Sequence, residues 1–217
     1  PPTIDKFAAD SEIALDEMRL WVIAHEMAGH TLLSIPHIAD HLRSLVQRHV
    51  EAFRPDSSAM TEKLTSLDVD QSDPIAAMQA AFGDPEVLLG AVRSAEQVAL
   101  EPELDTAVAV TIGVIDWVVD AVAVRIIGGN ALPIADAVRR RRAEASPDDM
   151  FVERLLGIRL GADQTGRGKA FVQGVVDRGG ENGLAPLFND ADAVPTPNEI
   201  GAPGLWLARV ADFDSAD

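Results

Sequence analysis

The segment from about residue 103 to residue 127 constrains the fold more than any other part of the chain. It follows Pro102, ends at the Gly-Gly-Asn of residues 128–130 and carries apolar side chains on nearly every side of a predicted helix. A helix that is apolar all round is stable in water only when neighbouring elements cover it. The sequence therefore predicts a mainly α-helical, bundle-like core around this central helix, with few or no strands.

Helical periodicity and turn residues predict shorter helices on both sides of the central one. The expected ranges are 16–30 with Asp16 as N-cap, 36–53, 62–67, 73–82, 86–100, 133–144, 149–156 and 165–178. We expect residues 1–14 to be coil. The stretch from Asp190 is rich in Pro, Gly, Asp and Ala. We therefore expect a helical domain over 1–189 and an irregular tail over 190–217, packed on the domain or trailing from it.

The chain is strongly acidic. Its 217 residues include 35 acidic and 18 basic side chains, which gives a formal charge of −17. This balance argues against nucleic-acid and anionic-membrane partners, because both require clustered basic side chains. We interpret the one basic run, Arg139 to Arg142, as a solvated helix end rather than an interaction patch, since cations stabilise a helix C-terminus. A protein or a peptide is then the expected kind of partner.

Three sequence features bear on the cellular compartment. The chain has no cysteine, which rules out disulfides and thiolate metal sites. Its first residues lack the charged-then-apolar pattern of a signal peptide. The longest apolar stretch, Ala107 to Ile115, ends at Asp116 and is shorter than the roughly 18 residues of a membrane span. These features predict a soluble, cytoplasmic protein.

All five histidines lie between residues 25 and 49, and the first begins a motif close to a zinc-hydrolase signature. Residues 25–30 read His-Glu-Met-Ala-Gly-His, one residue longer than His-Glu-x-x-His. In the standard motif the two histidines lie about 40° apart around the helix and bind one zinc, and the Glu is the general base. Five residues turn about 140°, so His25 and His30 cannot share a metal in a regular helix.

Two interpretations of this motif stay open. A π-bulge near Gly29 would bring His30 round toward His25, and such bulges often occur at functional sites. His25 and His30 would then be zinc ligands and Glu26 the general base. In the favoured interpretation, His25 shares a helix face with Trp21 and is a hydrogen-bonded core histidine, while Glu26 is a carboxylate at the rim.

Two further pairs of side chains have the spacing of one helix turn. His37 and His41 could hold a metal together, but no Glu follows His37, so a chance pairing is favoured. Asp116 and Asp120 lie on the apolar helix, where an unpaired carboxylate is costly. We expect a His or an Arg from another helix to bind them. A structural polar network is favoured over carboxylates that orient a metal-binding histidine.

An ordered series of short segments resembles the zincin-like metallopeptidase family that is associated with deazaflavin-coenzyme biosynthesis. The first segment is the Arg-Leu-Trp-Val-Ile-Ala-His-Glu of residues 19–26. The others follow in the family's order at 35–36, 40–42, 116–120, 154–157, Gln164, Gly168, Phe171, 194–196, Glu199 and 206–210. The series spans nearly the whole chain. The resemblance implies a zincin-type core and a metal-dependent peptidase.

The resemblance also implies which residues would bind zinc, and the chain departs from that pattern. The family has His-Glu-x-x-His on one helix and Glu-Gly-His-x-Asp on a later one, where the Glu is the expected third ligand. Here Gly29 occupies the second ligand position of the first motif, and Ile112 and Val114 replace the Glu and His of the second. Two of the three expected ligands are absent, whereas catalytic zinc needs about three protein ligands.

The favoured hypothesis is a zincin-like homologue with a degenerate metal site, which acts as a non-catalytic binding or scaffolding protein without a cofactor. The alternative is an atypical zinc-dependent hydrolase, with Glu26 as base and His25 and His30 as ligands. Its third ligand would come from Asp116, Asp120, His37 or His41. A further hypothesis is a metal-free acid–base hydrolase that uses Glu26 with His25.

Overall fold

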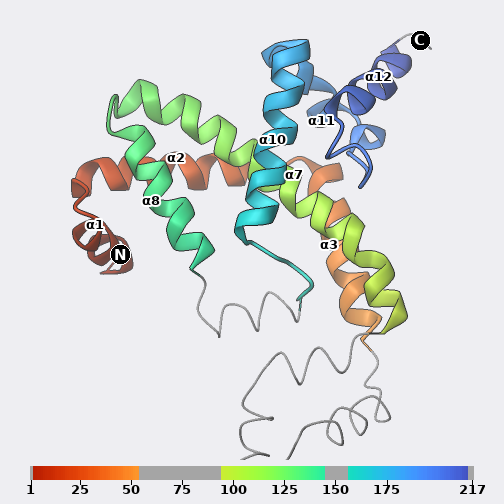
Figure 1. Ribbon diagram of the computed structural model, residues 1–217, viewed down its shortest axis with the longest axis horizontal. Coiled ribbons are helices and arrows are strands. Elements are labelled where there is room, and N and C mark those ends of the chain that lie inside the picture. Colours follow the sequence, from red (N-terminus) through yellow and green to blue (C-terminus); the bar gives the residue numbers. More distant parts are fainter. Residues whose placement is uncertain (1, 54–93, 145–155, 215–217) are drawn as a thin grey trace, which may run out of the picture.

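A computed structural model of the protein describes residues 2–53, 94–144 and 156–214. The helices predicted over 62–67 and 73–82, and the one predicted over 149–156 except for its last residue, lie outside these residues. The described ranges contain eight α-helices, two short 3-10 turns and no strand. Helix α7, Ala95–Ile126, runs through the middle, and other helices pack along it (Figure 1). The prediction of a mainly helical fold around one central apolar helix is confirmed.

The central helix begins earlier than the sequence suggested. Ser94 is its N-cap, and its side chain and that of Gln97 bind each other's backbone N–H groups in a capping box. Pro102 lies inside the helix, so the expected break between 86–100 and 103–127 is wrong. A proline inside a helix removes one backbone hydrogen bond. Buried side chains before and after Pro102 keep the helix continuous.

Helices α2, Leu15–Leu33, and α3, Pro36–Glu51, cover different halves of α7. Trp21 of α2 packs with Val119 in the C-terminal half, and Leu45 of α3 packs with Leu104 in the N-terminal half. The predicted N-cap of α2 is wrong, because the cap is the residue before Leu15 and makes no side-chain bond. Asp16 lies in the first turn of α2 instead, where its negative charge interacts favourably with the positive end of the helix dipole.

The N-terminal residues form a helix, α1, Pro2–Asp10, so the prediction of coil over 1–14 is wrong over these nine residues, whereas residues 11–14 are non-helical as expected. Ile4, Phe7 and Ala8 recur at helical spacing and pack against the cluster around Trp21, and Ala8 is only 1% exposed. A nine-residue helix is marginal by itself. Packing on α2 therefore stabilises this short helix.

Helix α10, Ala162–Gly179, crosses α7 at very short range (Figure 1). A Cβ atom built at Gly168 would lie 1.8 Å from the Ala109 carbonyl oxygen, and one built at Gly113 would lie 2.4 Å from the backbone of Gly168. Only glycine fits at these two positions. The crossing brings the two backbones together and buries Phe171 and Val172 in the main core.

The C-terminal part is more ordered than predicted. After α10 come a 3-10 turn, Glu181–Leu184, helix α11, Ala185–Asn189, and a second turn, Ala191–Ala193. Helix α12, Pro203–Asp214, then packs on α10, so the expected irregular tail is wrong over these residues. Trp206 explains the order, because it is fully buried, donates to the Ala193 carbonyl at 2.6 Å and meets Phe171 edge-on.

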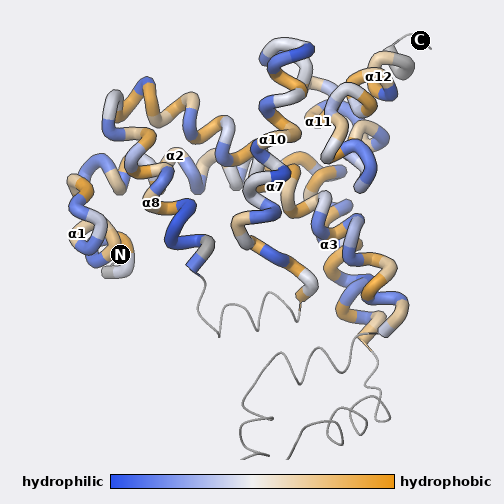
Figure 2. The backbone as a smooth tube through the Cα atoms, viewed as in Figure 1, coloured by the Kyte–Doolittle hydropathy of each residue, from blue (hydrophilic) through white to orange (hydrophobic). Residues whose placement is uncertain are grey.

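Among the described helices, α7 is long and apolar enough to cross a membrane by length and composition. The sequence estimate, which stopped at Asp116, was therefore too short. A buried core helix passes the same test, and 56% of the most apolar window of α7 is buried here. Figure 2 shows orange apolar residues along α7 and a blue hydrophilic end on α8, Ala131–Ala143, which contains the basic run.

Candidate functional site

Helix α2 carries the His-Glu pair on a regular α-helix. It is α-helical from Leu15 to Leu33, so the π-bulge considered near Gly29 does not form. The His25 ring stacks on Trp21, with ring centroids 5.2 Å apart and planes 21° apart. His25 Nδ1 lies 3.5 Å from Glu26 Oε1, and the Glu26 side chain is 77% exposed. The pair thus lies at the surface edge of the α2 core face.

His30 does not join His25. It is exposed and lies five residues further along the same regular helix. Throughout the part of the chain that the structure describes, no three His, Asp or Glu side chains are grouped so that they could hold a metal ion.

Gly29, Ile112 and Val114, at which the sequence departs from the expected zinc motifs, are small or aliphatic and lie beside apolar side chains. Gly29 faces α7, where a Cβ atom would lie 3.8 Å from Ile115 Cδ1. Val114 is 2% exposed within the main core, and Ile112 packs against the buried cluster between α3 and α7. The structure therefore fills these positions with apolar packing.

A cavity of about 430 Å³ lies between α2, α7 and α11, which we call the α2–α7 groove. Thr31 is the only polar residue in its lining. Met27 and Val122 line it from α2 and α7 and are 65% and 36% exposed, and Phe188 lines it from α11. Val114 also lines it from α7.

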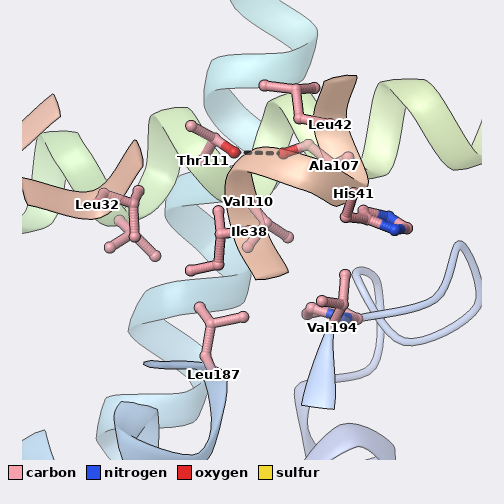
Figure 3. A pocket seen from close by; sticks show the side chains of 11 residues that line it. Leu32, Ile38, His41, Leu42, Ala107, Val110, Thr111, Leu187 and Val194 are labelled. Atoms are coloured by element: carbon pink, nitrogen blue, oxygen red, sulfur yellow. Dashed lines mark hydrogen bonds between the residues drawn. The ribbon is translucent and has the colours of Figure 1, made fainter. Parts of the chain in front are cut away.

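The second histidine pair makes separate contacts. His37 Nε2 lies 2.9 Å from the Leu187 carbonyl oxygen on α11. His41 lines a small cavity beside α3 and is the one titratable side chain in its lining (Figure 3). Burial lowers the pKa of His41, and the charge of Glu103 opposes this shift while that of Arg48 adds to it. The other residues that line this cavity are apolar except for Thr111, and His37 is not among them.

Asp116 and Asp120 bind arginines of α8 rather than a histidine. Arg139 donates to both oxygens of Asp120 at 2.7 and 2.6 Å, and Arg139 and Arg142 reach Asp116 at 3.3 to 3.4 Å. Asp116 is only 4% exposed, so this network is largely buried. Burial acts to lower the pKa of Arg139, but hydrogen bonds and charge from Asp120 and Asp116 outweigh it and raise the pKa.

This network corrects the interpretation of the basic run as a simply solvated helix end. Arg139 and Arg142 turn toward α7, and each has a side chain only 18% exposed. Arg140 and Arg141 stay exposed.

Sequence reasoning missed a second polar network, at the C-terminal end. Arg209 donates to Glu199 Oε1 at 2.6 Å and Oε2 at 2.9 Å, and it also binds the Val194 carbonyl. Burial acts to raise the pKa of Glu199, but hydrogen bonds from Arg209 and Thr196 outweigh it and lower the pKa. The network ties α12 to the preceding turn. The family-like segments at 194–196, Glu199 and 206–210 were the one signal that could have indicated it.

Comparison with known proteins places this fold. A family profile described as zincin-like metallopeptidase matches residues 1–207, and the chain belongs to this family. A search of curated proteins finds no match.

A solved structure shares the fold: "a putative hydrolase with a novel fold" from Chloroflexus aurantiacus. It superposes with a TM-score of 0.65 at 20% identity, over 97% of this chain and 57% of that one. This chain thus spans little more than half of that protein's length. At this identity the likeness concerns the fold alone.

Proposed function

We propose that this chain is a zincin-like metallopeptidase homologue with a degenerate metal site, which acts as a non-catalytic binding protein. One observation carries the proposal: Gly29 and Ile112 occupy the two ligand positions that the family resemblance implies, Val114 occupies the position of the histidine in the second motif, and Ile112 and Val114 pack in apolar clusters. Well-packed aliphatic side chains in place of buried polar ones are often neutral or stabilising.

Among the described residues, the polar side chains of α2 do not supply the zinc ligands that the family pattern would require. His25 is held against Trp21, and His30 points away on a regular helix. Glu26 is mostly in water, whereas a catalytic base is expected in a cleft next to its substrate.

The α2–α7 groove supports the binding role. Its lining is almost entirely apolar, and Met27 is exposed at its edge. Exposed apolar surface of this kind commonly marks a site for a protein or peptide, and a methionine adapts to partners of different shape. We propose that the groove takes an apolar segment of a protein or peptide partner.

We further propose that the chain belongs to the branch of the family associated with deazaflavin-coenzyme biosynthesis and works in the cytoplasm without nucleic-acid or membrane partners. The ordered family-like segments support the first point, and the charge of −17 together with the lack of cysteine supports the second.

Zinc analysis tests the degenerate site. The purified full chain and its His25→Ala variant would be loaded with zinc, dialysed against a weak chelator and measured by inductively coupled plasma mass spectrometry. We expect far less than one zinc per chain in both proteins. Near-stoichiometric zinc in the wild type that His25→Ala removes would overturn the proposal and favour the zinc-dependent hydrolase.

A further inference from the structure

The basic run of α8 is divided between two opposite faces of the helix. Arg139 and Arg142 bind the carboxylates of α7. Arg140 and Arg141 lie on another face with Ala137 and Glu144, at the i, i+3, i+4 and i+7 spacing of one helical stripe. That stripe faces α1, so Arg140 and Arg141 do not take part in the buried network between α8 and α7.

Helix α1 presents a stripe of the same spacing to α8. Thr3, Lys6, Phe7 and Asp10 lie on it, and Ser11 continues it. The two stripes enclose a cavity of about 420 Å³, which we call the α1–α8 groove.

The charges of this groove differ from those of the whole chain. Lys6 is bonded to Asp10 at 2.5 Å, so these two charges largely offset each other. Arg140 and Arg141 then face a single carboxylate, that of Glu144. In a chain of charge −17, this is a local excess of positive charge.

Two of the residues that line the groove, Phe7 and Ala137, are apolar. Phe7 is half-buried and Ala137 is 7% exposed. Thr3 and Ser11 add hydroxyl groups beside them. An aromatic surface next to two guanidinium groups can take a ligand that is apolar at one end and anionic at the other.

We propose that the α1–α8 groove binds an anionic group, a carboxylate or a phosphate, carried on an apolar ring or side chain. The guanidinium groups of Arg140 and Arg141 match the paired oxygens of such anions. Phe7 and Ala137 receive the apolar part, and the hydroxyl groups of Thr3 and Ser11 complete the donor set. The proposal does not depend on the metal site or on the α2–α7 groove.

Calorimetric titration of the full chain at low salt tests this proposal with four probes. N-acetylphenylalanine and phenyl phosphate carry both parts of the predicted ligand, N-acetylphenylalanine amide lacks the charge, and inorganic phosphate lacks the ring. We expect saturable binding of the first two with dissociation constants of about 1 mM or below, weakened by added salt. We expect markedly weaker binding of the amide and of inorganic phosphate.

Two variants locate the binding. The double substitution Arg140→Gln/Arg141→Gln should weaken binding of both aromatic anions about tenfold or more. Arg125→Gln, which removes an exposed cation at the end of α7, should leave it unchanged. If circular dichroism shows that the double variant has lost helix, the two single variants replace it. The proposal is overturned if the wild type binds neither aromatic anion, if the amide binds as well as the acid, or if the arginine substitutions leave binding unchanged.

Discussion

The central helix meets α10 and α2 in opposite ways. Against α10 its backbone comes so close that Gly113 and Gly168 leave no space for a Cβ atom. Against α2 it leaves a groove of about 430 Å³, and a Cβ atom added at Gly29 of α2 would lie at ordinary contact distance from Ile115. The first contact fixes the arrangement of the helices by excluded volume. The second leaves apolar surface exposed, so the two sides of one helix differ in how tightly they are packed.

The character of the side chains on α7 also depends on which residues of the neighbouring helices surround them. Asp116 and Asp120 are retained where α8 supplies two arginines. Ile112 and Val114 lie in regions where apolar side chains surround them. A buried carboxylate persists where charged partners compensate its desolvation, and an aliphatic residue suits a site without them.

The largest effect should come from Gly168→Ala. The new methyl group would overlap the Ala109 carbonyl oxygen, so α7 and α10 must separate. We expect a loss of about 3 kcal/mol in the free energy of unfolding, measured by urea denaturation followed by circular dichroism.

Gly166→Ala on the same helix is the matched control, because no atom lies within 4 Å of its added Cβ. It should stabilise the protein by up to about 1 kcal/mol, since alanine favours a helix over glycine. Equal stability of the two variants would contradict the close contact between α7 and α10.

Asp116→Ala should have the next largest effect. It leaves Arg139 and Arg142 partly buried without the carboxylate that they share, and we expect a loss of about 2 kcal/mol. The figure is below that of a fully buried pair because both arginines retain some contact with water. Urea denaturation of Asp116→Ala and of Asp120→Ala should show the smaller loss for the more exposed Asp120. A stable Asp116→Ala protein would mean that the network is not structural.

Gly29→Ala tests the opposite face of α7 with the same kind of change as Gly168→Ala. The added methyl group would make an ordinary contact with Ile115 and improve helix propensity. We expect a gain of about 0.5 to 1 kcal/mol in the free energy of unfolding. A loss as large as that of Gly168→Ala would show that α2 packs on α7 as tightly as α10 does.

Met27→Gln should have the smallest effect on stability, within about 0.5 kcal/mol, because the side chain is largely exposed. It should nevertheless lower the fluorescence of anilinonaphthalene sulfonate bound to the folded protein, since this dye reports exposed apolar surface. Leu205→Gln on α12 is the control, with a similarly exposed apolar side chain away from the groove. If Met27→Gln left the dye fluorescence unchanged, the α2–α7 groove would not be the main apolar surface that binds the dye.

Local signals predicted part of the fold and part of the candidate site. Apolar periodicity indicated α7, α3 and α10, and the stacking of His25 on Trp21 agrees with their shared helix face. The helices α1 and α12 escaped prediction because one or two buried side chains, such as Ala8 and Trp206, stabilise them through contacts distant in sequence. A Pro- and Gly-rich composition indicates which local backbone conformations a segment prefers, but it does not indicate such long-range contacts.

The sequence by itself determined the apolar central helix, the one-residue excess between His25 and His30, and the small or aliphatic residues at 29, 112 and 114. These follow from residue identity and from the period of a helix. Only the tertiary structure decided that Asp116 binds arginines, that the basic run splits between two faces, and that a groove opens beside α2. The physical reason is that charge pairing and cavities depend on which helices cross and how closely. Here two glycines, Gly113 and Gly168, set that distance.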